Sequence, residues 1–432
     1  MTYKSEFLNI LSERGFLHQC SDYEALDAKL MSGVQSAYIG FDATARSLHI
    51  GNLTGIMMLK WFQECGHKPI TLMGGGTSKV GDPSFKSETR KMLTDEDIND
   101  NIENIRATCF KQFLNYGDGK TDAKMVNNDD WLSSLHYLSF LRDYGRYFSV
   151  NKMVSYEFIR SRFENESFVS LLEFNYMVMQ GYDFLELHRR EGTILQMGGS
   201  DQWGNIINGV DLAHKSDKVQ LYALTAPLLL NSAGEKMGKT VGGAVWLNKN
   251  MLSAYDYWQY FRNVDDADVG NLLARFTMLP MDEVKRLSSL QGSEINEAKK
   301  ILAHHATMLC HGEQAALDAA ATAQKVFEQG GIGGDLPAFT AFATNGDTKI
   351  PLVDVFVGTK LSSSKGEARR LIEGGGARFN DEPVGDVTAS LLAKDWAGKG
   401  PQKVSSGKKK HAMLEIAVDA AKADGGFAIH PA

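Results

Sequence analysis

The 432-residue sequence has little of what marks secreted, metal-binding or membrane proteins. Its four cysteines form no CxxC pair, which gives no support to a disulfide framework or a zinc site and suits reduced thiols in the cytoplasm. No stretch reaches the roughly 18 uninterrupted apolar residues of a membrane-spanning helix. The N-terminal segment MTYKSEFLNILSERG carries charge throughout and lacks the apolar run of a signal peptide. These absences favour a globular, cytoplasmic protein with no membrane partner.

Possible metal ligands are also scarce. The nearest thing to a cluster is formed by His304, His305, Cys310 and His311, in an Ala-rich stretch that is predicted to be helical. Core or surface histidines are the simpler interpretation of this stretch, so we expect no protein-borne metal site.

Basic residues are in the minority overall but not near the C-terminus. The formal net charge of −7 at pH 7 argues at first against a nucleic-acid partner. Residues 359–432, however, contain twelve Lys and Arg against nine Asp and Glu. A basic C-terminal module on an acidic body can bind a polyanion, although charged tails are often only solvated.

The alternation of apolar strands and polar loops predicts a parallel α/β sheet. Strands are expected at SAYIGFD, HKPITLM, TILQM and YALTAPLLL, each followed by a glycine-rich or polar loop. Residues 1–35 and about 95–190 are predicted to be mostly helical. In doubly wound sheets the ligand lies beyond the carboxyl ends of the strands, so one site could use all four loops.

The length of the chain predicts two or three domains, and its changes in composition indicate where they meet. We expect a Rossmann-like doubly wound parallel sheet domain over residues 1–247, with a helical insertion at about 120–190. An α-helical domain over 248–332, a glycine-rich linker over 333–349 and a small α+β module over 350–432 follow.

The loop GGGTSKVGDPSFKSETR has the glycine spacing of a Walker A motif but not its chemistry. Gly76 and Gly81 are correctly spaced, but Asp82 stands where that motif requires Lys. A carboxylate there would repel phosphates and is better suited to a ligand ammonium group, whereas Lys86 and Arg90 could meet phosphates. Taken alone, the loop is as well explained by a solvated turn.

The turn SLHIGN precedes a predicted helix. The first backbone N–H groups of a helix are unpaired and attract anions. His49 and Asn52, three positions apart, would project from one side of this terminus, and Gly51 leaves room for a flat ring against the backbone. A helix cap with a chance histidine explains the turn equally well.

The segment GEKMGKT, residues 234–240, carries two lysines between glycines. A loop with two ammonium groups can wrap a triphosphate and follow charge as it moves to a leaving pyrophosphate. A solvated lysine loop is the alternative. The histidine turn and this segment together are more specific than either one alone.

The histidine turn and the lysine segment together resemble the two signatures of class I aminoacyl-tRNA synthetases. Further segments of the chain are similar to bacterial-type tyrosyl-tRNA synthetases. The matching segments are YIGFDATARSLHIGNL, GGGTSKVGDPSFKSETR, DYGRYFSVNKM, EFNYMVMQGYDF, QMGGSDQWGNI, EKMGKT and SSSKGEARRLIEGGGARFNDEPV. They run in order from residue 38 to residue 384, so the resemblance covers nearly the whole chain. One departure is Asn52, where the commonest family pattern has His.

The resemblance implies a tyrosine pocket. The residues that it assigns to tyrosine are Tyr38, Asp82, Tyr176, Gln180, Asp183 and Gln202. Tyr38 and Asp183 would bind the phenol hydroxyl from two sides, while Asp82, Tyr176 and Gln180 would surround the ammonium group. Gln202 would lie beside the carbonyl group of the substrate. The spacing i, i+4, i+7 of the three residues in EFNYMVMQGYDF places them on one helix face. A buried aromatic helix is the alternative for that segment, but its polar residues would then need partners.

The resemblance also implies an ATP site. The residues that it assigns to the triphosphate are Thr44, His49, Asn52, Lys86, Arg90, Lys236, Lys239 and Thr240. Those that it assigns to the rest of ATP are Gly40, Asp42, Gly51, Gly199 and Asp201, with Lys239 shared. Asp201 would hold the ribose. Mg²⁺ would accompany ATP, which is a substrate, and no tightly bound prosthetic group is expected.

The activity implied has two steps. The carboxylate of L-tyrosine attacks the α-phosphorus of ATP to give tyrosyl-adenylate and pyrophosphate, and the tyrosyl group then passes to the 3′-terminal adenosine of tRNA(Tyr). The C-terminal module resembles an S4-type RNA-binding domain, and residues 250–330 would help to bind the anticodon stem. The candidate phosphate contacts of the C-terminal module are Lys365, Arg369, Arg370, Lys408, Lys409 and Lys410. A homodimer is the family expectation.

Three alternatives remain open at the level of sequence. A tryptophanyl-tRNA synthetase would share the fold, but Tyr38 and Asp183 suit a phenol better than an indole. A small-molecule adenylyltransferase would not need the lysine segment or the C-terminal module. A non-catalytic RNA-binding protein descended from a synthetase would not need intact ATP-site residues.

Overall fold

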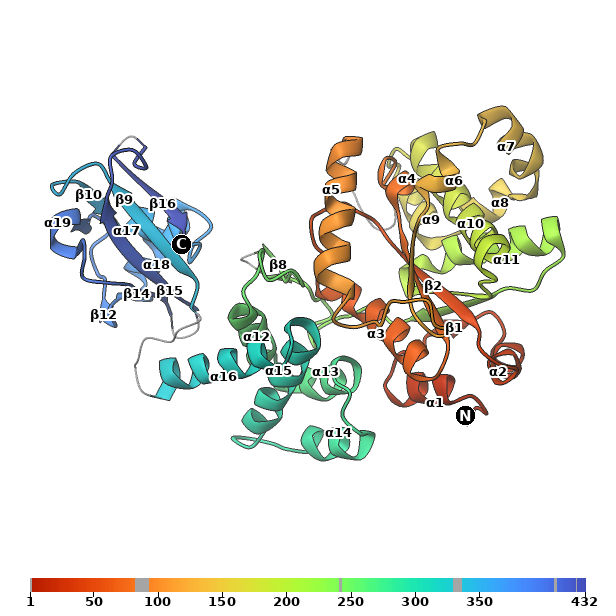
Figure 1. The fold of residues 1–432 in the computed structure, drawn as a ribbon, viewed down its shortest axis with the longest axis horizontal. Helices are drawn as coiled ribbons and strands as arrows, with labels where there is room; N and C mark the ends of the chain where they lie inside the picture. The colour runs from red at the N-terminus through yellow and green to blue at the C-terminus, as the bar shows by residue number, and fades with distance from the viewer. Residues whose placement is uncertain (1, 82–92, 241–242, 329–335, 408–409, 425) are drawn as a thin grey trace. The chain divides into compact units, whose positions relative to one another are not determined.

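The computed structural model describes residues 2–81, 93–240, 243–328, 336–407, 410–424 and 426–432. The chain divides into two compact units. Figure 1 shows their helices and strands, coloured by residue number. The first unit comprises Met1–Gly238, Val245–Leu252 and Val264–Cys310. The second comprises Lys239–Ala244, Ser253–Asn263 and His311–Ala432. Within the described residues, no helix is long and apolar enough to span a bilayer.

A six-stranded sheet forms the centre of the first unit. Its strands are β1 (Gln19–Cys20), β2 (Ser36–Phe41), β3 (Lys68–Met73), β4 (Lys124–Asn127), β5 (Leu195–Gly199) and β6 (Tyr222–Ala226). The order is β1-β6-β5-β2-β3-β4, and all neighbours are parallel except β1 and β6. The strand order therefore reverses between β2 and β5, which is the topological switch point of a doubly wound sheet. The predicted fold class is confirmed.

Helices cover both faces of this sheet. The described helices of the first unit up to Asp217 are α1 (Glu6–Glu13), α2 (Tyr23–Met31), α3 (Ile50–Glu64), α4 (Gly75–Ser78), α5 (Asp95–Ile105), α6 (Asp129–Leu132), α7 (Tyr137–Asp143), α8 (Val150–Val154), α9 (Glu157–Glu164), α10 (Leu171–Glu191) and α11 (Trp203–Asp217). A π-helix, η1 (Arg106–Phe110), follows α5, and short 3₁₀ turns lie at η2 (Gly145–Tyr147) and η3 (Ser200–Gln202). Right-handed crossovers leave the switch point in opposite directions, which places α3 and α11 on opposite faces.

Two strands of this six-stranded sheet were missed by the sequence pattern. β4 lies inside the stretch that was predicted to be mostly helical, and β1 lies between the two helices correctly expected in residues 1–35. β1 has two residues and β4 has four, so both are too short to show an apolar alternation of period two. They are strands because β1 pairs with β6 and β4 pairs with β3, not because of their local sequence.

The region after residue 250 is helical, as predicted. Its helices are α12 (Ala254–Arg262), η4 (Asp266–Asp268), α13 (Val269–Phe276), α14 (Met281–Ser288), α15 (Ile295–His311) and α16 (Glu313–Glu328). α12 packs on α16 within the second unit, and α13 packs on α14 within the first.

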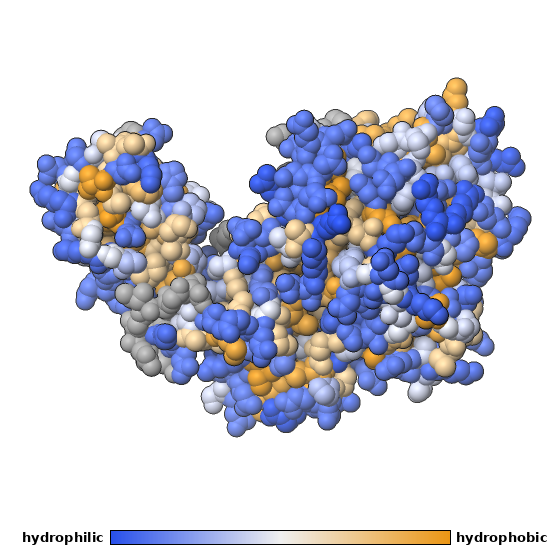
Figure 2. All heavy atoms as spheres, in the orientation of Figure 1, coloured by the Kyte–Doolittle hydropathy of each residue, from blue (hydrophilic) through white to orange (hydrophobic). Residues whose placement is uncertain are grey.

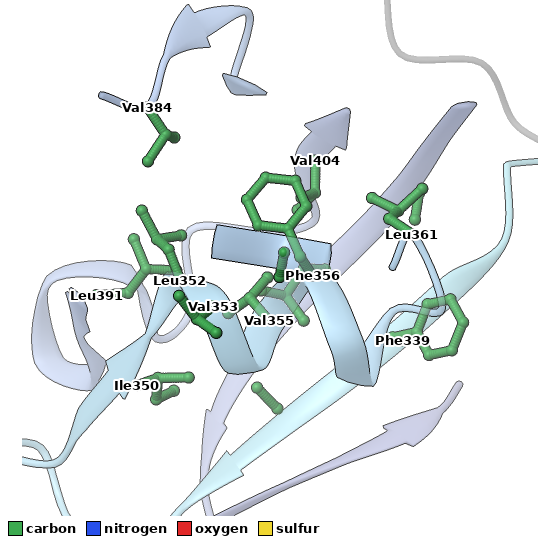
Figure 3. Close-up of a cluster of buried hydrophobic side chains, with 14 of the residues drawn as sticks. Phe339, Ile350, Leu352, Val353, Val355, Phe356, Leu361, Val384, Leu391 and Val404 are labelled. Atoms are coloured by element: carbon green, nitrogen blue, oxygen red, sulfur yellow. The ribbon is translucent and has the colours of Figure 1, made fainter. Parts of the chain in front are cut away.

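The C-terminal module is a second, mixed sheet with its own core. Its elements are β9 (Ala338–Ala343), β10 (Lys349–Pro351), α17 (Leu352–Gly358), α18 (Lys365–Glu373), β11 (Ala377–Phe379), β12 (Glu382–Pro383), β13 (Ser390–Leu392), α19 (Ala393–Trp396), β14 (Gln402–Ser406), β15 (Lys410–Val418) and β16 (Phe427–Pro431). The main sheet has the order β12-β11-β14-β15-β9-β16. Figure 3 shows Val355 and Phe356 of α17 in the same apolar cluster as Val404 of β14.

Candidate active site

The carboxyl ends of the parallel strands carry the polar loops. Asp42 directly follows β2, a glycine-rich turn from Gly74 to Gly76 follows β3, and Asp201 follows β5. Because parallel strands end at one edge of the sheet, these loops meet beside the switch point.

Tyr38 and Asp183 form the most deeply buried polar pair of this site. Tyr38 lies on β2 with no exposed side-chain surface, and its hydroxyl has no hydrogen-bond partner among the described residues. Asp183, on α10, is 2% exposed. Burial, together with the nearby Asp183 charge, raises the pKa of Tyr38 well above its ordinary value, so the phenol stays neutral. A buried hydroxyl that lacks a partner is suited to a polar ligand.

Two neutral donors hold the Asp183 carboxylate in place. Asn128 Nδ2 donates to Asp183 Oδ2 at 2.9 Å, and Trp131 Nε1 donates to Asp183 Oδ1 at 2.7 Å. Burial nevertheless raises the pKa of Asp183 to about 7, against the lowering effect of these two hydrogen bonds. Neither Asn128 nor Trp131 was identified from the sequence, since neither belongs to a recognisable motif.

Asn128 also joins this pair to the glycine-rich turn. Its Oδ1 accepts the Gly76 N–H at 2.8 Å, and its Nδ2 donates to Thr77 Oγ1 at 3.0 Å. Asn128 is 1% exposed, so its amide is committed to these contacts. The position of Asp183 thus depends on the loop after β3.

Gln180 and Tyr176 lie one and two turns before Asp183 on the same helix, as predicted. The Tyr176 hydroxyl lies 3.4 Å from both carboxylate oxygens of Asp42. Gln180 Oε1 is buried and has no hydrogen-bond partner within the described part of the chain. Asp42, which the resemblance assigns to ATP, thus lies beside Tyr176, which it assigns to tyrosine.

Gln196 is a further candidate that the sequence did not reveal. It lies on β5 directly opposite Tyr38 in the β2–β5 register, and it is 2% exposed. Its Oε1 has no partner among the described residues. A buried amide beside Tyr38 is a natural neighbour for a bound polar group, and an unpaired Gln on a central strand is the signal that could have indicated it.

His49 and Asn52 cap α3 together. His49 is the N-cap residue, and its Nδ1 accepts the Gly51 N–H at 3.0 Å. Asn52 Oδ1 in turn accepts the His49 N–H at 3.1 Å. Each side chain therefore uses its acceptor atom in the cap, so the remaining nitrogen of each is a donor. Two donors at a helix N-terminus suit an anion.

The flat ring that lies against Gly51 is the His49 imidazole. A Cβ at position 51 would approach His49 Cε1 to 2.7 Å, so a side chain there would displace the ring. Gly51 is therefore required by the cap itself.

The lysine loop, defined as residues 234–238, returns towards this cap. Met237 N donates to Leu229 O at 2.9 Å, which attaches the loop to the segment that follows β6 in the chain. Gly238, with φ of +112°, lies so close that a Cβ there would be 3.0 Å from Ile50 Cγ2 and 3.5 Å from His49 Nδ1. Lys236 is exposed in this loop.

The loop after β5 positions Asp201 and Gln202, both half-buried. A Cβ on Gly199 would stand 2.5 Å from Asp201 Oδ1, so glycine is needed where the carboxylate lies. Asn205 Nδ2 donates to Gln202 Oε1 at 3.2 Å, which helps to hold the Gln202 side chain in this loop. Asn205, fully buried on α11, is another residue that the sequence did not indicate.

The structure does not describe the side chains of some predicted site residues. Asp82, Lys86, Arg90, Lys408 and Lys409 lie outside the described residues, as do the side chains of Lys239 and Thr240. The backbone of the latter two forms β7 (Lys239–Thr240), paired with β8 (Gly243–Ala244). Thr44 and Gly40 are exposed near the end of β2.

The basic residues of the C-terminal module lie on α18 and at the start of β15. Lys365, Arg369, Arg370 and Lys410 are all exposed. Lys365 Nζ forms an ion pair with Asp354 at 2.6 Å. Hydrogen bonds from Ser363 lower the pKa of Glu367, and the positive charges of Lys410 and Arg370 lower it further. The charges of Lys410 and Arg370 therefore lie near α18, which carries Glu367.

Known proteins match this chain over nearly its full length. Residues 32–328 match the model of the class I tRNA synthetases for tryptophan and tyrosine, and residues 329–414 match the C-terminal domain of tyrosine–tRNA ligases. The tyrosine–tRNA ligase of Rhodospirillum rubrum is 55% identical over 413 residues, which cover 96% of this chain and 98% of that protein. The chain belongs to the tyrosine–tRNA ligase family. The relative from Brucella suis, at 53% identity over 415 residues, supports the same assignment.

Solved structures of this family share the fold. The truncated mitochondrial tyrosyl-tRNA synthetase of Aspergillus nidulans has a TM-score of 0.67 at 28% identity, covering 75% of this chain and 94% of that one. A tryptophanyl-tRNA synthetase from Encephalitozoon cuniculi has a TM-score of 0.51 at 12% identity, with coverage of 72% and 87%. The fold is therefore common to both specificities, and the sequence relatives separate tyrosine from tryptophan.

Proposed function

We propose that this protein activates L-tyrosine with ATP and transfers the tyrosyl group to tRNA(Tyr). The observation that carries the proposal is the buried Tyr38 and Asp183 pair at the switch point of the sheet. A phenol hydroxyl donates to the Asp183 carboxylate and also bonds with the Tyr38 hydroxyl, which has no other partner among the residues that the structure describes. Phenylalanine has no hydroxyl group to bond the buried Tyr38 hydroxyl or to donate to Asp183, so it is rejected.

No side chain acts as a nucleophile, because the tyrosine carboxylate attacks the α-phosphorus itself. The protein holds the two anions together and stabilises the charge that develops on the phosphates. The outward donors of His49 and Asn52 bond phosphate oxygens at the start of α3, while Lys236 and Lys239 neutralise the departing pyrophosphate. The Gly199 and Asp201 turn holds the ribose. Mg²⁺ enters with the triphosphate, whose oxygens it prefers.

The test is amino-acid-dependent exchange of pyrophosphate into ATP, measured with tyrosine, tryptophan and phenylalanine. Exchange is expected with tyrosine alone. Exchange with tryptophan, or none with any amino acid, would overturn the proposal. A positive result followed by no charging of tRNA(Tyr) would leave an adenylate-forming enzyme without the second step.

The exposed cations of α18 and Lys410 support tRNA binding by the C-terminal module. Phosphate contacts of this kind position RNA and lose strength as salt rises. We assign Lys365, Arg369, Arg370 and the lysines at 408–410 to this RNA-binding surface. We also propose that the enzyme works in the cytoplasm.

The protein is proposed to be a homodimer. Leu138 on α7, Phe168 before α10 and Leu171 on α10 are 77%, 80% and 70% exposed, which is unusual for apolar side chains. Figure 2 shows hydrophobic residues at the surface over α7, on a face that is otherwise mostly hydrophilic. A second copy of the chain covering these residues would remove them from water.

Light scattering after size-exclusion chromatography measures the molar mass of the protein in solution and so tests for the homodimer. The wild type is expected at twice the chain mass, and Leu138→Asp or Leu171→Asp is expected to shift it to the monomer. Leu317→Asp on α16, a 48% exposed leucine in the other unit, is the matched control and should leave the mass unchanged. A monomeric wild type would contradict the homodimer.

A further inference from the structure

A short antiparallel ladder joins the histidine turn to the chain that follows the lysine loop. Leu247 N donates to Leu48 O at 2.9 Å, and Ile50 N donates to Val245 O at 2.9 Å. His49 and Trp246 face each other between these bonds as an isolated β-bridge. The residues that follow the lysine loop are thus in register with the cap of α3.

Ser47 lies at the end of this ladder. Its hydroxyl oxygen accepts the Asn248 N–H at 3.0 Å and donates to Leu48 O at 2.7 Å. Ser47 and Asn248 are 4% and 2% exposed, so water cannot readily replace either bond. The Ser47 hydroxyl therefore bonds the backbone of both strands of the ladder.

The π-helix η1 contacts Ser47 and Leu48, the two residues before His49. Cys109, in η1, is fully buried, and its Sγ accepts the Leu48 N–H at 3.5 Å and lies 3.7 Å from Ser47 Oγ. π-helical turns are rare and often occur beside functional sites. Here the extra residue of the turn brings a sulfur atom against the backbone that precedes His49.

The ladder also fixes the lysine loop. Val245 N donates to Gly238 O at 3.0 Å, so the last residue of the loop is bound to the first residue of the ladder. Gly238 in turn packs against Ile50 and the backbone of Gly51. A shift of residues 245–248 along the turn would therefore move Gly238, and Lys236 with it, relative to His49.

We propose that Ser47 is a positioning residue for adenylate formation, which sets the register of the lysine loop on the His49 cap. The inference rests on the proposed function, because it assumes that the loop and the cap bind one triphosphate. Ser47 touches neither ATP nor tyrosine in this scheme. It acts through the Asn248 backbone and the Leu48 carbonyl.

Ser47→Thr and Ser47→Val provide a matched test, because both add the same volume and only threonine keeps a hydroxyl. Ser47→Ala is the third variant, since it is smaller than serine and cannot overpack the site. Single-turnover formation of tyrosyl-adenylate, equilibrium binding of tyrosine and cleavage by trypsin after Lys236 are measured for each. The expected loss in the rate constant for valine or alanine is roughly tenfold, the size of one neutral hydrogen bond.

The expected pattern is selective. Threonine should stay within about threefold of the wild type, whereas valine and alanine should slow adenylate formation and speed cleavage after Lys236, with tyrosine affinity unchanged. Equal rates for the threonine and valine variants, with alanine at the wild-type rate, would overturn the inference. So would a parallel loss of tyrosine binding, which would indicate general destabilisation. A wild type without tyrosine-dependent exchange would instead contradict the proposed function.

Discussion

Asn52 Oδ1 accepts the backbone N–H of His49 at 3.1 Å. The same amide therefore has two separable tasks, because its oxygen completes the cap of α3 and its nitrogen remains a donor beside the helix N-terminus. This relationship explains why Asn can stand where the commonest family pattern has His.

Substitutions at Asn52 are expected to separate capping from phosphate binding. Asn52→Asp keeps the acceptor for the cap but replaces the donor by a negative charge, so stability is retained while adenylate formation slows more than in Asn52→Ala. For Asn52→Ala the rate should fall by about tenfold with little change in tyrosine affinity, and Asn52→His should be tolerated. Single-turnover kinetics and thermal unfolding measure the two effects. An Asn52→Ala enzyme that activates tyrosine at the wild-type rate would show that only His49 matters there.

Removing one donor from Asp183 should weaken tyrosine binding. Trp131→Phe deletes the N–H that bonds Asp183 Oδ1 while keeping an aromatic ring in the core. Because the acceptor is a carboxylate, we expect tyrosine affinity to fall by roughly ten- to a hundredfold, with the KM for ATP nearly unchanged. Asn104→Ala on the exposed side of α5 is the control. Unchanged tyrosine affinity in Trp131→Phe would refute the positioning of Asp183 by Trp131.

The contribution of Asp183 to stability should decrease as pH rises. Burial raises its pKa to about 7 in the folded state, so between about pH 4 and about pH 7 the native protein binds more protons at this site than the unfolded chain does. The free energy of unfolding of the wild type, minus that of Asp183→Asn, is therefore expected to fall by on the order of a few kcal/mol across this window and to level off above it. Urea denaturation from pH 4.5 to pH 8 measures the difference, in which other titrating groups cancel. A difference that is flat, or that rises with pH, would contradict the raised pKa.

A methyl group at Gly199 should act on ATP alone. Gly199→Ala would place its Cβ 2.5 Å from Asp201 Oδ1, so the carboxylate must move. We expect a higher KM for ATP, by about tenfold if one charged hydrogen bond is lost, and an unchanged affinity for tyrosine. Gly385→Ala, where a Cβ would meet no atom within 4 Å, is the matched control. Equal kinetics in the two variants would argue against a ribose site at Asp201.

The cations of α18 should differ in their effect on tRNA. Lys365 is already paired with Asp354, whereas Arg369 forms no ion pair within the described part of the chain. Arg369→Ala is expected to weaken tRNA binding and to reduce the dependence of log affinity on log salt by about one phosphate contact. Lys365→Ala should have a smaller effect. Filter binding across a salt series tests this, and equal slopes for the two variants would contradict it.

The sequence by itself determined the class of the fold, the family and the motifs. The apolar stretches that became β2, β3, β5 and β6 carry local signals, as does α10 with its residues at i, i+4 and i+7. The histidine turn and the lysine segment were recognisable because each is contiguous. Short strands such as β4 carry no such signal and form only by pairing with a neighbour.

Only the tertiary structure decided what surrounds those motifs. Asn128 reaches Asp183 across 55 positions, and Asn248 reaches Ser47 across 201, so no spacing in the sequence could indicate either contact. The physical reason is burial. Once the sheet and its helices close over these polar groups, each must find a partner inside the protein. Those partners are chosen by proximity in the folded chain, while the motifs record only which groups meet the substrates.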